Sequence, residues 1–182
     1  MTKIMLAQQY ILYCASVHVT CFSTIASNVL ARQCDANRKP KQVLMYLGGR
    51  GGCGKTQVIQ AITHLHTLLG IREKMRLTAY TGTAAAAIGG NTTSSVTQTY
   101  LTKDKAPDVK KLEATWSNIE TLVVDEVSMI PCDMMKQMSA SLVKAKHDDE
   151  ELPFAGIDVV FAGENLFIAL YYHTNPIYRK PI

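Results

Sequence analysis

Four short apolar runs alternate with segments in which apolar residues recur at helical spacing. The runs cover residues 43–47, 75–80, 121–126 and 157–162, and the third ends in two carboxylates. The first run is apolar throughout, which is typical of a parallel strand buried on both faces. Four strands that alternate with helices predict an α/β fold with right-handed connections and a parallel sheet flanked by helices.

The segments around these runs predict the helices and loops of the fold. Helical periodicity predicts helices over residues 21–31, 55–69, 81–87, 108–116 and 132–146. Residues 91–105 are rich in Thr, Ser and Lys and predict a loop on the ligand face. His64 and His66 lie two positions apart on a predicted helix, so they do not face each other, and we expect solvent exposure rather than a metal site.

Composition narrows the class of protein. The 182 residues have the size of one ordinary domain. The hydrophobic fraction of 47% and the charged fraction of 19% are those of a globular protein and exclude a disordered one. A net charge of +4 permits nucleic-acid binding without arguing for it. The five cysteines are odd in number and form no C-x-x-C pair, so we expect reduced intracellular thiols.

The N-terminal stretch from Ile4 to Ala31 contains no Asp, Glu, Lys or Arg. Polar residues interrupt it, so no window of about 18 consecutive apolar residues remains. A buried or amphipathic helix is therefore favoured over a targeting or membrane-spanning segment, and no membrane partner is expected. We assign residues 1–40 to this helical segment and a polar linker, and residues 41–182 to the lobe that carries the motifs described next.

A glycine-rich stretch directly after the first predicted strand has the pattern of a phosphate-binding loop. Residues 49–56 fit G-x-x-x-x-G-K-[ST], in which glycines let backbone N–H groups turn inward around a phosphate. The residues predicted to contact nucleotide are Gly49, Gly51, Gly52, Cys53, Gly54, Lys55 and Thr56. Lys55 would neutralise the β- and γ-phosphates, and the Thr56 hydroxyl would bind Mg²⁺. A glycine-rich turn in another kind of α/β protein is the less favoured interpretation.

The third predicted strand ends in Asp125 and Glu126. Carboxyl ends of parallel strands share one edge of the sheet, so these acids should lie beside the phosphate loop. Asp125 would hold Mg²⁺, and Glu126 would act as the general base that orients the attacking water. The other interpretation is that the two acids open a turn or cap the next helix.

The series of motifs resembles the N-terminal RecA-like lobe of the Pif-type 5′-to-3′ DNA helicases, including the relatives carried by Helitron transposons. The resemblance covers roughly residues 19–178. The segments that carry it are Met45-Tyr46-Leu47-Gly48-Gly49 with Gly54-Lys55-Thr56, Tyr80-Thr81-Gly82-Thr83-Ala84-Ala85, Val124-Asp125-Glu126-Val127-Ser128-Met129, and Pro153-Phe154-x-Gly156.

The resemblance implies a P-loop NTPase fold and a DNA helicase that hydrolyses ATP with Mg²⁺ to move on single-stranded DNA. It implies that Lys55 and Glu126 are catalytic and that Thr81, Gly82 and Thr83 lie near single-stranded DNA. It further implies roles in DNA repair, recombination and telomere maintenance, in the nucleus or, less favoured, the mitochondrion. The family places ATP between two lobes, so a chain with the first lobe alone is expected to bind Mg·ATP with little turnover.

The sequence also departs from the family. Its third motif reads G-D-F-x-Q-L-P-P, but Phe167 replaces the glutamine, and a phenyl ring can neither donate nor accept a hydrogen bond. Ser94 stands where the family has His, and His18 falls where an adenine-reading Gln is expected. A nucleotide-binding pseudo-helicase without turnover therefore remains open. A P-loop nucleoside-type kinase is less favoured, because Arg179 is the only arginine after Arg76.

The phosphate loop contains a thiol, Cys53. We expect its oxidation or alkylation to block nucleotide binding, because the group would lie inside the loop. Thiol modification in the presence and absence of ATP tests this, since ATP should protect the thiol if the loop is assigned correctly.

Overall fold

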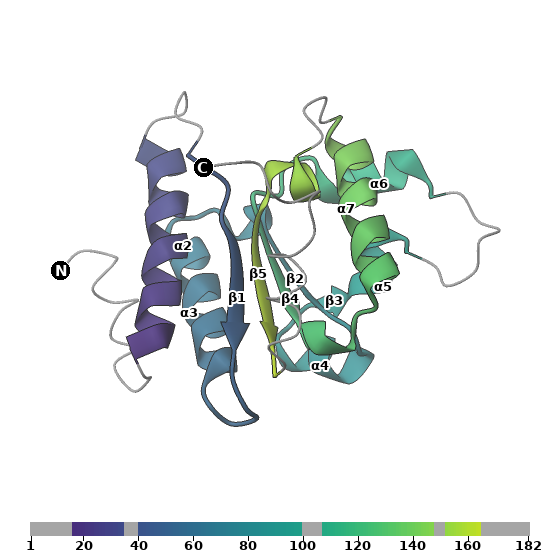
Figure 1. Cartoon of the computed structure of the whole chain (residues 1–182). Helices are drawn as coiled ribbons and strands as arrows, with labels where there is room; N and C mark the ends of the chain where they lie inside the picture. The colour runs from purple at the N-terminus through teal and green to yellow at the C-terminus, as the bar shows by residue number, and fades with distance from the viewer. Residues whose placement is uncertain (1–15, 35–39, 100–106, 148–151, 165–182) are drawn as a thin grey trace.

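The computed structural model describes residues 16–34, 40–99, 107–147 and 152–164, which are coloured in Figure 1. Its centre is a sheet of five parallel strands in the order β1-β5-β4-β2-β3. The strands are β1 (Leu44–Gly48), β2 (Met75–Ala79), β3 (Asn91–Thr92), β4 (Thr121–Asp125) and β5 (Asp158–Gly163). The α-helices are α2 (Ser16–Cys34), α3 (Lys55–Leu68), α4 (Gly82–Ala87), α5 (Thr93–Thr97), α6 (Val109–Trp116) and α7 (Cys132–Lys146). Three short 3₁₀ helices are η1 (Arg72–Lys74), η2 (Val127–Met129) and η3 (Pro153–Gly156). The predicted parallel α/β sheet is confirmed.

Helices cover both faces of the sheet. Helices α2 and α3 lie on one face, and α6 and α7 lie on the other (Figure 1). Side chains of β4 alternate between the two cores, because successive residues of a strand point to opposite faces. Val123 packs with residues of α2 and α3, whereas Leu122 and Val124 pack with residues of α6 and α7. The central strand is thus apolar at its buried positions except Thr121, whose hydroxyl lies 3.2 Å from His66 Nε2.

Strand β1 lies at the edge of the described sheet, and its residues except Leu47 are exposed or half-buried, so the expectation that it is buried on both faces is wrong. Within the described ranges its strand partner is β5, and it has no second one. Leu47 is buried, but Leu44 is 41% exposed. The apolar pattern could not reveal this, because the order of strands in a sheet depends on contacts between distant segments.

The N-terminal helix is longer than expected and packs as expected. Helix α2 spans 19 residues, and Phe22, Ile25 and Val29 are buried in the core that it shares with α3. Among the helices in the described ranges, none is both long enough and apolar enough to cross a membrane. The segment is a packing element of this lobe.

The expectation of a loop over residues 91–105 is wrong for its first part. Residues 91–97 form β3 and α5, so the described sheet has five strands instead of the expected four. The Thr93 hydroxyl, which is buried, donates to the Ala79 carbonyl over 3.1 Å. This tertiary bond offsets the weak strand and helix propensity of a Thr/Ser-rich segment. Residues 100–106, the acidic run at 148–151 and the third motif from Asn165 onward lie outside the described residues.

The expectation of exposed histidines is wrong for His66. Its side chain is 1% exposed, with Nδ1 at 2.9 Å from the Ile62 carbonyl and Nε2 at 3.2 Å from Thr121 Oγ1. His66 lies four residues after Ile62 and therefore on the same buried side of α3. Burial lowers the pKa of this imidazole, because the charged form is disfavoured away from water. His64 is half-buried.

Candidate active site

The residues predicted to act on nucleotide and DNA lie at one edge of the sheet. The phosphate loop follows β1, the segment from Thr81 follows β2, and Asp125 and Glu126 end β4 and open the next turn. All of these strands are parallel, so their carboxyl ends meet at the same edge. The structure therefore brings together every site residue that the sequence predicted. Their chemical roles remain predictions.

The phosphate loop depends on glycine at specific positions. Gly52 and Gly54 have φ angles of 76° and 96°, which residues with a Cβ rarely adopt. A Cβ on Gly49 would lie 2.3 Å from Cys53 Sγ, so a side chain there would force the thiol to move. The Gly49 N–H donates to the Gly163 carbonyl at the end of β5 over 3.1 Å, which anchors the start of the loop. Gly54 then directly precedes α3 as its N-cap residue.

Lys55 is the cation of this loop. Its ammonium donates to the carbonyls of Gly49 over 2.6 Å and Arg50 over 2.9 Å, so it lies within the curve of the loop. Cys53 Sγ is 3.9 Å from the same nitrogen. An ammonium has three protons and can exchange a carbonyl for a phosphate oxygen. Lys55 is thus already directed at the place where the loop would hold a phosphate.

The two carboxylates of the β4 end differ in their surroundings. Asp125 is half-buried, and burial raises the pKa of its carboxyl group, although the positive charge of Lys55 acts in the opposite direction. Asp125 Oδ1 accepts a hydrogen bond of 2.9 Å from the Glu126 N–H. Glu126 has a φ of 53°, a left-handed conformation that costs free energy for a residue with a Cβ. Backbone strain of this kind is found where a functional side chain must be aimed.

The side chain of Glu126 bonds to the segment after β2. The Thr81 hydroxyl donates to Glu126 Oε2 over 2.8 Å and accepts from the Ala84 N–H over 3.2 Å, which caps α4. The sequence predicted a separate role for each of the two residues but not their contact. Only the parallel pairing of β2 with β4 places them side by side.

Two further groups at this edge were missed or loosely placed by the sequence. Glu164 is near the phosphate loop, since a Cβ on Gly51 would lie 3.1 Å from its Oε1. His18 lies in the first turns of α2, is 6% exposed, and has no hydrogen-bond partner at Nδ1. The opposite end of α2 contacts the beginning of β5 through Arg32 and Asp158. A helix of 19 residues is about 28 Å long, and Figure 1 shows the N-terminal end of α2, the end that contains His18 in its first turn, on the side where β1 ends.

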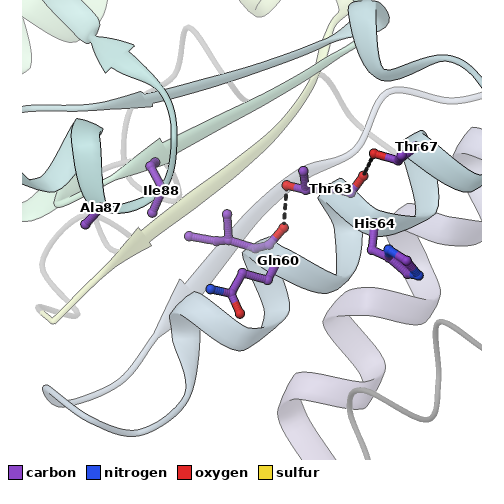
Figure 2. Close-up of a pocket in the computed structure, with 7 residues that line it drawn as sticks. Gln60, Thr63, His64, Thr67, Ala87 and Ile88 are labelled. Carbon is purple, nitrogen blue, oxygen red and sulfur yellow. Dashed lines mark hydrogen bonds between the residues drawn. The ribbon is translucent and has the colours of Figure 1, made fainter.

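A pocket between α3 and α4 is separate from this constellation. Its volume is about 320 Å³, and its lining residues are Ile59, Gln60, Thr63, His64, Thr67, Ala87 and Ile88. Figure 2 shows the Thr63 and Thr67 hydroxyls directed at the backbone of their own helix, where they donate to Ile59 and Thr63 carbonyls over 2.8 and 3.0 Å. The lining includes neither the carboxylates nor Lys55, so this pocket is not the place for phosphate chemistry.

The described residues contain no cluster of three or more His, Cys, Asp or Glu side chains that could hold a metal. Mg²⁺ keeps several waters and takes one or two oxygen ligands from the protein beside substrate phosphates, and the hydroxyl of Thr56 and the carboxylate of Asp125 are oxygen donors of this kind. A glycine-rich loop between a strand and a helix, with an acid at the end of a nearby strand, defines a P-loop NTPase. The strand order and the flanking helices are those of its RecA-like branch.

A family model described as PIF1-like helicase matches residues 22–171. The chain belongs to the PIF1-like helicase family. The "ATP-dependent DNA helicase RRM3" of Saccharomyces cerevisiae is 28% identical over 148 residues, which cover 77% of this chain and 19% of that protein. The resemblance that the motifs carried is thereby confirmed.

Solved structures of Pif1 have the same fold. Bacteroides sp. Pif1 in complex with ADP-AlF4 superposes with a TM-score of 0.57 at 25% identity, over 79% of this chain and 31% of that chain. Bacteroides Pif1 bound to ssDNA gives a TM-score of 0.54 at 25% identity, with the same coverage. The chain thus spans about a fifth of the length of RRM3 and about a third of the solved Pif1 chains.

Proposed function

We propose that this chain is the ATP-binding lobe of an ATP-dependent DNA helicase, which hydrolyses ATP with Mg²⁺ to move on single-stranded DNA. The observation that carries the proposal is the gathering of Lys55, Asp125 and Glu126 at the carboxyl edge of the sheet, next to Thr81. Membership of the PIF1-like helicase family supports it, as does the similarity to the ATP-dependent DNA helicase RRM3.

The loop residues would hold the triphosphate. The backbone N–H groups of the glycine-rich turn would surround the β-phosphate, and Lys55 would exchange its bonds to the Gly49 and Arg50 carbonyls for bonds to the β- and γ-phosphates. The unpartnered Nδ1 of His18 supports a role of this ring in contacting the adenine base. The complex of Bacteroides Pif1 with ADP-AlF4 supports nucleotide binding by this fold.

Thr56 and Asp125 would hold Mg²⁺, which neutralises phosphate charge when it is bound. The exposed Thr56 is the first residue after Lys55 on α3, and Asp125 has one oxygen bonded to the Glu126 N–H. The half-buried Asp125 carboxylate has few protein donors, which suits a group that binds a cation. Glu126 would accept a proton from the water that attacks the γ-phosphate.

Single-stranded DNA would pass the segment that follows β2. The exposed Gly82 and Thr83 and the half-buried Thr81 offer hydroxyl and backbone N–H groups, which are the usual donors to DNA phosphates. The structure of Bacteroides Pif1 with ssDNA supports this partner. We further propose that the protein acts in DNA repair, recombination or telomere maintenance, in the nucleus or the mitochondrion, with the nucleus favoured.

Binding of a fluorescent ATP analogue with Mg²⁺, and of a labelled oligothymidylate, tests the proposal directly. We expect the chain to bind both. We expect Lys55→Ala to lose the nucleotide and keep the oligothymidylate. A wild-type chain that binds neither ligand would contradict the assignment.

Two other functions predict different results in assays of ATP hydrolysis and of phosphoryl transfer. A nucleoside-type kinase would transfer the γ-phosphate to a nucleoside and would not respond to DNA, whereas a helicase lobe would hydrolyse ATP faster with DNA. A pseudo-helicase would bind nucleotide but would show equal, unmeasurable hydrolysis in the wild type, Lys55→Ala and Glu126→Gln. Turnover lost in both variants would favour the enzyme.

A further inference from the structure

One hydroxyl group connects the candidate general base to the segment proposed to meet DNA. Thr81 Oγ1 donates to Glu126 Oε2 over 2.8 Å and accepts from the Ala84 N–H over 3.2 Å. The two side chains are neighbours because Ala79, at the end of β2, pairs with Asp125, at the end of β4. The contact therefore joins two segments that lie 45 residues apart in the sequence.

The hydroxyl of Thr81 has a single proton to donate. That proton is directed at Glu126, because the lone pair that accepts from Ala84 fixes the orientation of the hydroxyl. A phosphodiester oxygen can only accept a hydrogen bond, so a DNA phosphate at Thr81 would need the same proton. Glu126 and a phosphate would therefore compete for Thr81.

The surroundings of the Glu126 side chain determine what happens to its carboxylate when Thr81 bonds to a phosphate instead. Within the described ranges, the bond from Thr81 is the hydrogen bond that the structure gives to the Glu126 carboxylate. The Glu126 backbone is in the left-handed region, with φ 53° and ψ 36°, so the chain turns sharply at the residue that carries the base. When the Thr81 proton is withdrawn, the described residues supply no other donor to that carboxylate.

We propose that Thr81 is a positioning residue whose hydroxyl donates its one hydrogen bond either to Glu126 or to a DNA phosphate, so that strand binding and the placement of the base are coupled. This inference rests on the proposed function, since it takes a single strand as the ligand and Glu126 as the base. Without DNA, Thr81 occupies Glu126 Oε2. With DNA, the phosphate accepts the hydrogen bond from the hydroxyl, and the carboxylate is released towards the attacking water.

Binding of a labelled oligothymidylate to four proteins tests the coupling without any need for turnover. The proteins are the wild type, Thr81→Val, Glu126→Ala and the double variant. If Glu126 competes for the proton, Glu126→Ala tightens DNA binding by about tenfold when Thr81 is present, as expected for a hydrogen bond to a charged group. In the Thr81→Val background, Glu126→Ala tightens DNA binding only by the small factor expected from the removal of one negative charge.

Matched variants distinguish an effect of the lost coupling on DNA binding from an effect of lost folded structure. Thr83 lies two residues away and makes no described contact with Glu126, so Thr83→Val weakens DNA binding but leaves the Glu126→Ala factor at its wild-type value. Thr81→Ser retains the hydroxyl and restores the coupling. This variant matters because Thr81→Val also removes the cap of α4, whose loss destabilises a helix by about 1 kcal/mol.

A second measurement follows the hydrogen bond itself. The ¹³C resonance of the Glu126 carboxylate should shift when oligothymidylate is added to the wild type, and in the same direction in free Thr81→Val. An equal Glu126→Ala factor in both backgrounds, or a resonance that DNA does not move, overturns the coupling while the proposed DNA binding stands. A wild-type chain that does not bind the oligomer overturns both.

Discussion

An aspartate lies at the edge of the sheet where the strands begin, and another lies at the edge where they end. The surroundings of the two carboxylates differ. Asp158 begins β5 at the amino edge and is fully buried, with Val43 N–H donating over 2.8 Å, Asn28 Nδ2 over 3.0 Å and Arg32 completing an ion pair. Asp125 ends β4 at the carboxyl edge, is half-buried and accepts one hydrogen bond from the Glu126 N–H. Among the described residues, the Asp158 carboxylate has three partners, and the half-buried Asp125 carboxylate has one hydrogen-bond donor.

This difference in partners distinguishes a carboxylate that stabilises the fold, Asp158, from one that is a candidate for ligand binding, Asp125. The partners of Asp158 come from α2 and from the residue before β1, so the charge holds distant segments together. Burial raises the pKa of Asp125, and the charge of Lys55 offsets part of that effect. A carboxylate that the fold buries without enough partners is a candidate for ligand binding.

The same substitution should therefore have opposite effects at the two edges, and the largest is expected at the amino edge. Asp158→Asn removes one partner of a buried ion pair and should lower the free energy of unfolding by about 3 kcal/mol. ATP affinity should not change. Urea denaturation measures the loss. Lys136→Leu is the control, because its pair with Asp133 is exposed and 3.9 Å long, and it should change stability by less than about 0.5 kcal/mol. If Asp158→Asn lowered the free energy of unfolding by as little as the control does, Asp158 would not have the structural role assigned to it.

At the carboxyl edge, Lys55→Ala should weaken ATP binding by about 100-fold, which corresponds to about 2.7 kcal/mol. The reason is the loss of charged hydrogen bonds to the phosphates. Titration with a fluorescent ATP analogue measures it. Lys110→Ala, an exposed lysine on α6, serves as the control for a lost positive charge. The stability of Lys55→Ala should stay close to wild type, and unfolding of this variant would show that the lysine has a structural role instead.

Asp125→Asn should stabilise the protein while it impairs the site. A pKa raised by burial means that the folded state prefers the protonated acid, so stability is lost as pH rises through the folded-state pKa. Asparagine removes this cost at neutral pH, and Tm should rise by about 1–4 °C. The increase in ATP affinity that Mg²⁺ produces should disappear. A lower Tm would place Asp125 in the same class as Asp158.

The smallest effect is a pH dependence at His66. Burial lowers its pKa from the ordinary value of 6.5, so its contribution is present above that pH and is lost as pH falls through the folded-state pKa. Wild-type stability should therefore decline on acidification below about 6.5. His66→Gln should flatten this part of the profile, as followed by thermal unfolding at several pH values. An unchanged slope would assign the acid sensitivity to other groups.

Much of the fold was predictable from local patterns. Helix α7 has the predicted bounds, and Asp108 caps α6 through a bond from the Lys111 N–H at the predicted place. The position of β1 in the sheet, the burial of His66 and the short β3 were not predicted. The position of β1 and the short β3 depend on contacts with segments far away in the sequence, to which periodicity is blind. The burial of His66 follows from its spacing of four residues after Ile62, which the prediction of exposure did not take into account.

The candidate site was likewise predictable from the sequence only in part. The order of glycines, Lys55 and Thr56 is a local requirement of a phosphate loop, so the sequence alone was enough to predict it. The contact of Thr81 with Glu126 and the effect of Lys55 on Asp125 depend on which strands are neighbours.

The sequence by itself determined the chemical groups of this protein: a loop that accepts phosphate, two carboxylates after a strand, and a threonine after another. The tertiary structure decided how those groups act on one another. Its parallel sheet brings their strand ends to one edge and leaves Asp125 short of partners, while it pairs Asp158 fully at the other edge. The physical reason is that burial and pairing are properties of contacts between strands, and no single strand contains them.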